Sequence, residues 1–227
     1  MLLKGGFKLI RFRVKGDYAC FSRPEFKVER VSYDLITPSA ARGLLEAIFW
    51  HPGLCYRINK IYLLSPIKFC NVRRNEVALK ISANNAQQVY NGSNKELFMS
   101  TTGKNVQQRA SMILQDVEYI IEAHFVMTEN ANATDNHGKF QEMLKRRLRK
   151  GQNYHQPYLG CREFPAQISL YEGDISQEKL AYADEKKDLG FMLYDMDYSD
   201  LDNITPMFFR AVLDRGVLDL TDCEVHV

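Results

Sequence analysis

Three histidines lie where a turn or a helix end could present an imidazole to a substrate. His155 lies in a short tyrosine-rich turn, His51 follows a predicted helix, and His137 precedes Lys139 by two residues. Imidazole exchanges protons near neutral pH, because the ordinary pKa of histidine is about 6.5. The sequence therefore offers His155 first, then His51 and His137, as proton-transfer groups. For each of them the competing interpretation is a surface histidine that only makes hydrogen bonds.

A run of cations after Lys139 could bind phosphates. It contains five basic side chains with no carboxylate between them: Lys145, Arg146, Arg147, Arg149 and Lys150. Such a run often forms the solvated face of a helix. Because this one exceeds what solubility requires, contact with phosphate groups is the favoured interpretation.

Charge is unevenly distributed along the 227 residues. Residues 1–165 contain 25 Lys and Arg against 14 Asp and Glu, a net charge of +11, whereas residues 166–227 contain 5 against 14, a net charge of −9. A basic surface attracts polyanions, since neutralised phosphates release their counterions. We therefore expect the first part to bind nucleic acid and the acidic remainder to contact another protein.

The five cysteines are widely spaced and form no C-x-x-C pair; they are Cys20, Cys55, Cys70, Cys161 and Cys223. This pattern favours buried, apolar thiols in a reducing cytoplasm and argues against a structural zinc site. No apolar run approaches the roughly 18 to 20 residues of a membrane span. The sequence thus indicates a cytoplasmic protein with no metal or other cofactor and no membrane partner.

The elements that must position these residues alternate between extended and helical patterns. Residues 7–14 alternate apolar and basic side chains in part, as in a strand with one wet face. Thr37 can cap a helix that begins with Pro38 and stops before Pro52. Further strands are expected over residues 56–69, 116–127 and 162–170, a helix over 139–150, and a long polar loop over 83–109.

This order, strand, helix, strand, strand, helix, strand, predicts an α+β fold whose first domain is ferredoxin-like, of the RNA-recognition type, with a long inserted loop. The acidic segment contains strand patterns over residues 189–196 and 217–220 and a helix pattern over 206–213. We therefore expect two domains. Residues 1–171 form the ferredoxin-like domain, and residues 172–227 form a small acidic, β-rich C-terminal domain.

Five segments resemble, in the same order, the CRISPR-associated family-five proteins of subtype I-C, which belong to the repeat-associated superfamily. They are GDYACF at 16–21, SY at 32–33, ARGLLEAIFW at 41–50, RRNEV at 73–77 and YLGCREF at 158–164. One such segment would be a weak signal. Five in the right order, spread over nearly the whole chain, identify the sequence as a member of this family.

The resemblance implies a ferredoxin-like domain followed by a small β domain. It implies metal-independent cleavage of precursor CRISPR RNA at the base of the repeat hairpin. The implied partners are that hairpin, the other subunits of the type I-C surveillance complex that retains the 5′ handle, and target DNA through the complex. In related subtypes the family only caps the RNA, so a catalytically inert structural subunit is the alternative.

Metal-free RNA cleavage uses the 2′-hydroxyl as an internal nucleophile, so the protein must supply a base, a cation and an acid. The family pattern implies a tyrosine near the end of the first helix and Gly-Lys-His before the second. This sequence has Phe49 at the first place and Gly138-Lys139-Phe140 at the second. Phenylalanine cannot donate, accept or titrate. Only Lys139 carries over, as the group expected to stabilise the phosphorane.

Other residues must therefore move the protons if the chain is active. His155 is the first candidate base, His51 the second and His137 the third. Tyr154 and Tyr158, on either side of His155, are the remaining candidates.

The family-matched segments also contain residues expected to bind RNA. Arg73, Arg74 and Asn75 can contact phosphates or base edges near the sheet. Arg42 of the first helix and Arg162 of the last strand are further expected contacts. Glu163 either orients Arg162 or is an ordinary surface charge. The aromatic residues Tyr18, Phe21 and Tyr33 could stack on unpaired bases, although core packing is the commoner use of aromatic strand residues.

Overall fold

The computed structural model describes residues 9–26, 28–98, 101–103 and 105–227. Its described strands form one sheet of ten strands, in which every pair is antiparallel except β2 with β5. The elements in chain order are β1 Ile10–Ala19, β2 Arg30–Val31, α1 Pro38–Ile48, β3 Leu54–Leu63, β4 Phe69–Val77, α2 Ala83–Tyr90, β5 Val106–Met127, α3 His137–Lys150, β6 Gln167–Leu170, β7 Lys186–Asp197, β8 Thr205–Asp214, β9 Val217–Asp219 and β10 Val225–His226. The expected mixture of helices and strands is confirmed.

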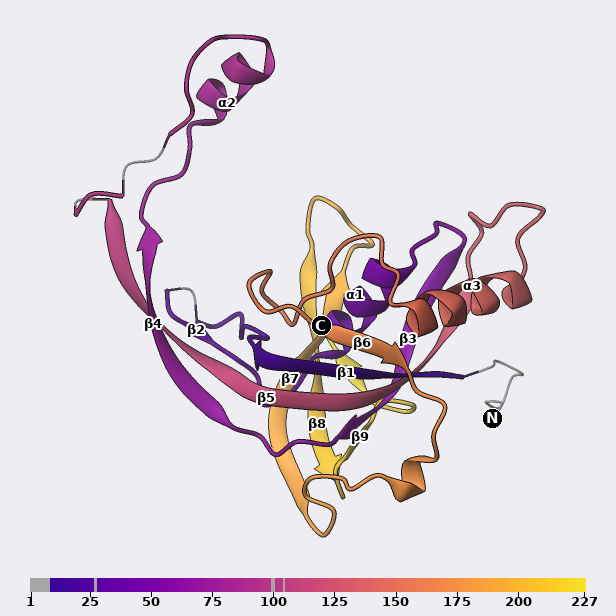
Figure 1. Ribbon diagram of the computed structural model, residues 1–227. Coiled ribbons are helices and arrows are strands. Elements are labelled where there is room, and N and C mark those ends of the chain that lie inside the picture. The colour runs from indigo at the N-terminus through magenta and orange to yellow at the C-terminus, as the bar shows by residue number, and fades with distance from the viewer. Residues whose placement is uncertain (1–8, 27, 99–100, 104) are drawn as a thin grey trace.

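Four neighbouring strands at one end of the sheet support two helices. The order is β3, β5, β1, β6, and α1 and α3 cover one face of these strands (Figure 1). Phe12 of β1 lies opposite Ile121 of β5. Because successive strand side chains point to opposite faces, Phe12 and Val14 turn into the core while Arg11 and Arg13 turn away from it.

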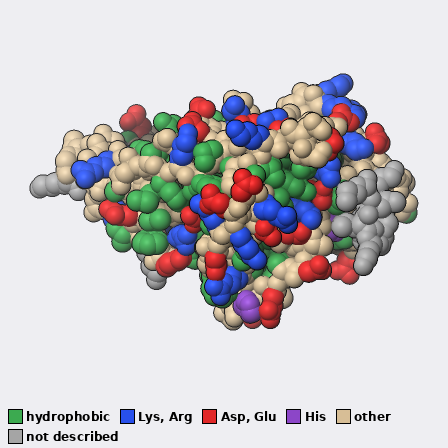
Figure 2. Space-filling model, turned by 90° about the horizontal axis from the view of Figure 1, so that it is seen from below, with side chains coloured by type: hydrophobic (Ala, Val, Ile, Leu, Met, Phe, Trp, Pro, Cys, Tyr) green, Lys and Arg blue, Asp and Glu red, His purple; other side chains and the backbone are tan. Residues whose placement is uncertain are grey.

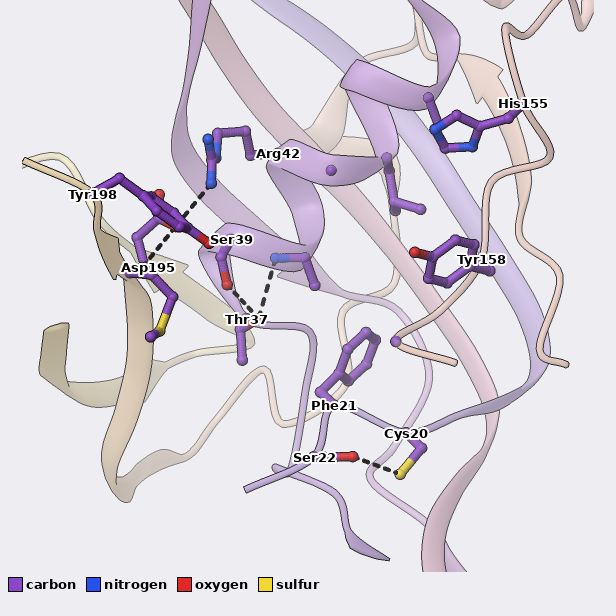
Figure 3. Close-up of a pocket in the computed structure, with 16 residues that line it drawn as sticks. Cys20, Phe21, Ser22, Thr37, Ser39, Arg42, His155, Tyr158, Asp195 and Tyr198 are labelled. Atoms are coloured by element: carbon purple, nitrogen blue, oxygen red, sulfur yellow. Dashed lines mark hydrogen bonds and ion pairs between the residues drawn. The ribbon is translucent and has the colours of Figure 1, made fainter. Parts of the chain in front are cut away.

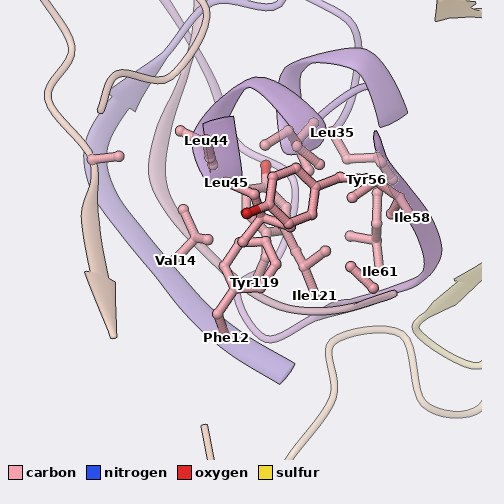
Figure 4. Packing of buried hydrophobic residues seen from close by; sticks show 14 of the residues in the cluster. Phe12, Val14, Leu35, Leu44, Leu45, Tyr56, Ile58, Ile61, Tyr119 and Ile121 are labelled. Atoms are coloured by element: carbon pink, nitrogen blue, oxygen red, sulfur yellow. The ribbon is translucent and has the colours of Figure 1, made fainter. Parts of the chain in front are cut away.

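The core lies between α1 and the sheet. Figure 4 shows Leu44 and Leu45 of α1 in one cluster with Val14, Tyr119 and Ile121 of the strands. Leu45 is 0% exposed, and burying such a side chain stabilises the fold by about 1.5–3 kcal/mol. Replacing Leu45 with Ala would cost about 2–5 kcal/mol, since a cavity adds to the lost burial.

The two ends of α1 follow from its sequence. The Thr37 hydroxyl accepts a hydrogen bond from the Ala40 N–H at 3.2 Å, and Pro38 occupies the first helical turn. The helix ends at Ile48, after which the backbone of Phe49 is extended. The expected start and stop are confirmed, and the chain leaves α1 directly toward His51.

The helix α3 begins two residues earlier than expected because Asn136 caps it. The Asn136 side chain accepts a hydrogen bond from the Lys139 N–H at 2.9 Å. Phe140 and Leu144 are buried on the side that faces the sheet. The helix ends at Gly151, whose φ of 62° is left-handed and costs glycine little.

A two-stranded arm extends from the body of the sheet, with α2 at its far end (Figure 1). It consists of β4 paired with the first part of β5, from Phe69 opposite Leu114 to Val77 opposite Val106. The expected loop over residues 83–109 is wrong in part, since α2 occupies its beginning and β5 starts at Val106. Pairing with β4 supplies backbone hydrogen bonds to a polar stretch that has no strong strand preference of its own.

The acidic C-terminal segment is β-rich, as expected, and joins the same sheet. β9 pairs with β3, with Leu218 opposite Ile61, and β7 pairs with β8. The expected helix over residues 206–213 is wrong, because these residues form β8. Phe209, Ala211 and Leu213 are buried at every second position, which is the period of a strand. The domain boundary between 171 and 172 stays a prediction.

The strands β1 and β6 begin later in the sequence than expected. β1 begins at Ile10, and Phe7 and Lys8 of the expected first strand lie outside the described residues. β6 begins at Gln167, after Pro165, whose nitrogen cannot donate to a ladder. Among the described residues, no helix is both long and apolar enough to cross a membrane.

Candidate active site and RNA interface

The end of α1 meets the start of α3 and brings three titratable side chains together. The Asp135 carboxylate accepts a hydrogen bond from Lys139 Nζ at 2.9 Å and lies 3.7 Å from His51 Nε2. Its side chain is 2% exposed and also accepts the Asn132 N–H at 3.0 Å. The Lys139 hydrogen bond, followed by the Asn132 bond, holds the pKa of Asp135 below its ordinary value. We call His51, Asp135 and Lys139 the His51–Lys139 group.

The hydrogen bonds of His51 indicate which ring nitrogen faces a ligand. Its Nδ1 accepts the Gly53 N–H at 3.0 Å, so this network assigns the proton of a neutral ring to Nε2. The 3.7 Å between Nε2 and Asp135 exceeds hydrogen-bond length, and 26% of the His51 side chain is exposed. His51 can therefore turn an N–H donor toward a bound molecule.

The two phenylalanines that replace the family tyrosine and histidine lie beside this group. The ring centroids of His51 and Phe140 are 4.8 Å apart, and those of Phe140 and Phe49 are 5.8 Å apart. Both phenylalanines are buried. The Arg147 guanidinium lies 5.1 Å from the Phe49 centroid and donates to the Ile48 carbonyl at 2.8 Å. Arg147 thus fastens α3 to the end of α1.

His137 faces a different direction from Lys139. Its ring stacks on Phe125 of β5, with centroids 4.2 Å apart and planes 16° from parallel. The structure therefore places His137 against the sheet, whereas Lys139 contacts Asp135 at the surface. Of the three candidate histidines, His51 is the one placed beside Asp135, the partner of Lys139.

His155 and Tyr158 lie at a separate pocket of about 400 Å³ alongside α1 (Figure 3). Arg42 of α1 also lines it and donates to Asp195 of β7 at 2.8 Å. His155 is exposed, and its loop is bonded to α1 through the backbone. The structure thus brings together His155, Tyr158 and Arg42, while Lys139 is not among the residues that line the pocket.

The cations of α3 differ in how they are held. Arg149 pairs with Glu172, with 2.6 Å between Nη2 and Oε1, and Arg147 is bound to the end of α1. Arg146 is exposed, and Lys145 is half-exposed beside a small pocket that Arg11 also lines. The sequence alone predicts a uniform run of cations, because these partners come from distant parts of the chain.

The expected RNA contacts of β4 lie on two faces of the arm. Arg73 and Asn75 are exposed on one face, and Arg74 lies on the other. The Arg74 guanidinium pairs with Glu163, so this carboxylate is engaged with the arm. Neither of the two interpretations of Glu163, as a partner of Arg162 or as an ordinary surface charge, included this pair with Arg74. Arg162 itself is exposed in the loop before β6.

The basic residues of β1 are matched by acids on β5. Arg11 Nε donates to Glu122 at 2.8 Å, and Arg13 Nε donates to Glu118 at 2.7 Å. Figure 2 shows the molecule from below, where basic and acidic side chains are interspersed around a group of apolar ones. The basic residues of the first part of the chain therefore do not form a continuous basic surface on this side.

The three aromatic candidates for base stacking have different surroundings. Phe21 and Tyr33 are buried in the core cluster, and Arg23 lies 4.5 Å from the Tyr33 centroid. Tyr18 is exposed, with its ring 6.1 Å from that of Phe164. Tyr18 is therefore the one of the three whose ring lies largely open at the surface.

Two cysteines lie in a polar cluster that sequence reasoning missed. Cys161 Sγ lies 3.6 Å from Arg30 Nη1 and 3.9 Å from the Cys20 carbonyl oxygen. The hydrogen bond with Cys161 is the largest cause that lowers the pKa of Cys20 to about 6, and Arg30 adds to it. The same contact raises the pKa of Cys161. No sequence signal links two cysteines so far apart in the chain.

A family model described as CRISPR-associated protein (Cas_Cas5), of the Cas5d type, matches residues 9–220. The chain belongs to this family. The match confirms the resemblance found in the five sequence segments. A Cas5-family relative from Mannheimia succiniciproducens, named CRISPR pre-crRNA endoribonuclease Cas5d, is 47% identical over 213 residues, which cover 93% of this chain and 94% of the relative.

Further relatives agree with this assignment. A protein of the same name from Thermus thermophilus is 44% identical over 189 residues, 83% of this chain and 73% of the relative. A solved structure described as a CRISPR-associated protein has a TM-score of 0.69 at 20% identity and covers 97% of both chains. A chain of a CRISPR RNA-guided surveillance complex has a TM-score of 0.51 at 12% identity, over 96% of this chain and 89% of the other. These two structures show the shared Cas5 fold.

Proposed function

We propose that this Cas5-family chain is a metal-independent endoribonuclease that cuts precursor CRISPR RNA at the base of the repeat hairpin. It then holds the 5′ handle in the type I-C surveillance complex. The names of the relatives at 44–47% identity support the activity. The observation that carries the proposal is the His51–Lys139 group, which lies against Phe140, where the family pattern has a catalytic histidine.

We further infer that β1, α1, β3, β5, α3 and β6 form a ferredoxin-like unit of the RNA-recognition type. The strand order β3, β5, β1, β6 supports this inference, because two β-α-β halves interleave in that order in such domains. The acidic residues 172–227 are proposed to form the second unit and to contact other subunits of the complex.

The proposed reaction forms a bond between the 2′-oxygen and phosphorus and breaks the bond from phosphorus to the 5′-oxygen. The products carry a cyclic phosphate and a 5′-hydroxyl. Lys139 stabilises the negative charge of the phosphorane, and Asp135 holds its ammonium group in place. The His51 Nε2–H donates a hydrogen bond to the departing 5′-oxygen, which takes up a proton from solvent. In this arrangement His51 acts as a donor, whereas its position in the sequence indicated a candidate base.

The remaining site residues keep their predicted roles as proposals. His155 accepts the 2′-hydroxyl proton from RNA bound along α1, and Tyr158 stays a catalytic candidate in the same pocket. His137 is the weakest candidate because it faces Phe125. RNA contact is proposed for the whole expected set, which is Arg42, Arg73, Arg74, Asn75, Lys145, Arg146, Arg147, Arg149 and Arg162.

Single-turnover cleavage of the cognate repeat RNA in the presence of a metal chelator tests the proposal. We expect His51→Ala to slow cleavage by about 10²- to 10³-fold, the usual worth of a hydrogen-bond donor to a developing negative charge. Lys139→Ala should slow it by about 10²- to 10³-fold, as for the removal of a donor to a developing negative charge. RNA affinity should change far less, because it is spread over many phosphate contacts.

His137→Ala is the matched control, because His137 faces Phe125. His155→Ala should also slow cleavage, because His155 is the proposed base. A large loss in His155→Ala with normal cleavage by His51→Ala would exclude His51 from the reaction. Wild-type protein that binds the hairpin tightly and never cuts it would support the inert cap. The buried phenylalanines at positions 49 and 140 are the observation that favours this second function.

A further inference from the structure

The pocket alongside α1 is built from four separate parts of the chain. Its walls come from the segment after β1, from α1, from the loop before β6 and from the end of β7. Its volume of about 400 Å³ falls in the range of small-molecule sites, roughly 300–1,000 Å³. A cavity of this size is large enough to hold a nucleobase.

Aromatic rings lie around the pocket. Figure 3 shows Tyr158 and Tyr198 on opposite sides, with Phe21 between them. Tyr198 is 55% exposed, so its ring is free to pack on a ligand. Proteins bind unpaired bases of RNA by stacking them on such rings.

One wall of the pocket is nearly bare helix backbone. A Cβ atom built on Gly43 would meet no heavy atom within 4 Å. Ala40 and Ala47 lie on the same side of α1, three residues before and four residues after Gly43. A flat group can therefore approach α1 closely between the tyrosines.

The polar groups of the pocket suit a base better than a phosphate. The Arg42 guanidinium donates to Asp195 at 2.8 Å and to Glu46 at 3.4 Å, so its charge is already balanced. Arg42 Nε is buried and has no hydrogen-bond partner among the described residues. Asp195 receives Arg42 and the Met196 N–H on the same oxygen, Oδ1, which leaves Oδ2 for the amino group of a ligand.

The pocket also lies next to the proposed cleavage site. The backbone N–H groups of Tyr154 and His155 both bond to the carbonyl of Ala47, near the end of α1 that leads to His51. An RNA strand bound at the His51–Lys139 group can therefore continue along α1. We propose that this pocket holds one unpaired base of that RNA, an inference that rests on the proposed function.

Filling the pocket from Gly43 provides the test. Gly43→Trp places an indole between the tyrosines. Gly43→Ala adds one methyl group, which meets no heavy atom of the protein within 4 Å and favours the helix, and it is the smaller step at the same position. Each protein is titrated with repeat RNA in which one unpaired nucleotide at a time lacks its base. Thermal unfolding of both variants checks that α1 remains folded.

For wild type we expect one position at which the missing base weakens binding by about 5- to 150-fold, the worth of one stacked base. The affinity of Gly43→Ala for intact RNA should lie between those of wild type and Gly43→Trp. Gly43→Trp should bind the intact RNA more weakly by a similar factor and should no longer respond to that missing base. If Gly43→Trp does not fold, Tyr198→Ala is used in its place, because it alters an exposed side chain. Tyr198→Ala should reduce the loss of affinity caused by the missing base at that position.

A folded Gly43→Trp variant that binds intact RNA like wild type and keeps its response to missing bases overturns the inference. In that case normal cleavage by wild type leaves the proposed function standing, so the two failures are distinguishable. A Gly43→Trp variant that binds RNA normally but no longer assembles with other subunits assigns the pocket to a protein partner, which also overturns it. Wild type that binds no repeat RNA overturns both proposals.

Discussion

Asp135 connects the two residues that are proposed to act on the RNA. It bonds to Lys139 through one carboxylate oxygen and lies near His51 with the other. An RNA phosphate that approaches Lys139 must compete with this carboxylate for the ammonium group. The proposed site therefore depends on a residue that need not itself react.

The first prediction at the scale of single residues concerns the titration of Asp135. Its pKa is lowered in the folded protein, so the ionised carboxylate adds stability above the ordinary carboxyl pKa, and this stability is lost as pH falls through the lowered value. Lys139→Ala removes the largest cause and should raise the pKa of Asp135. An NMR titration of its carboxyl carbon measures this change.

Lys145→Ala is the control, because Lys145 lies on the same helix and causes no shift of Asp135. The difference in unfolding free energy between wild type and Lys139→Ala should shrink as pH falls below about 4, where carboxylates are ordinarily protonated. An Asp135 titration that is the same in wild type and Lys139→Ala would show that the ion pair does not form in solution.

Part of this site could be predicted from the sequence. Lys139 and the three histidines could be named from residue types and from the family segments. Asp135 offered only an acid four residues before a lysine, which is a common pattern on helices. His51, and not His155, shares Asp135 with Lys139 because the end of α1 meets the start of α3. No pattern in the local sequence predicts that contact.

At the scale of elements, α3 carries cations in different states. Arg149 is paired with Glu172 and Arg147 is bound to the end of α1, while Arg146 and Lys150 are exposed. A side chain already engaged with the protein gains less from a phosphate, because it must first give up its partner. We therefore expect RNA affinity to depend unequally on these residues.

The combined substitution of Lys145, Arg146 and Lys150 by Ala should weaken binding to all RNAs. It should also flatten the dependence of log affinity on log salt by up to about one unit for each phosphate that the variant no longer neutralises. Arg149→Ala, the control, should change the slope less. Binding measured at several salt concentrations checks this, and equal slopes for wild type and the triple variant would rule out α3 as a phosphate-binding surface.

The helices were easier to predict than the strands. The start of α1 and the start of α3 each have a capping residue in the local sequence, and the buried residues of both recur at helical spacing. Both helices could therefore be predicted. β8 was mistaken for a helix because its aromatic and apolar residues fit either period over a short run. The polar strand residues of the arm are held in place by β4, which a local pattern cannot reveal.

At the scale of the whole molecule, the acidic segment and the first part share one sheet and one core. Phe209, Leu213 and Leu218 belong to the same buried cluster as Ile61 of β3. Removal of residues 172–227 should therefore expose apolar surface on β3 and α1 and prevent cooperative folding. Circular dichroism during heating measures this, with the full chain as the control.

A truncated protein that unfolds cooperatively and binds repeat RNA would contradict this expectation. It would also support the predicted boundary between 171 and 172. If truncation does unfold the chain, contact between the acidic segment and other subunits is better tested by exposed substitutions such as Asp200→Asn.

The strand β5 passes through two environments that should differ in how often they open. From Val117 to Ala123 it is paired with β1 on one side and, from Tyr119, with β3 on the other, whereas Val106 to Ala110 pair only with β4 in the arm. Two-stranded ribbons open at low free energy. In deuterated water the amide hydrogens of residues 106–110 should therefore exchange much sooner than those of residues 119–123. Exchange along this one strand would then measure both the local opening of the arm and the global unfolding of the rest of the sheet.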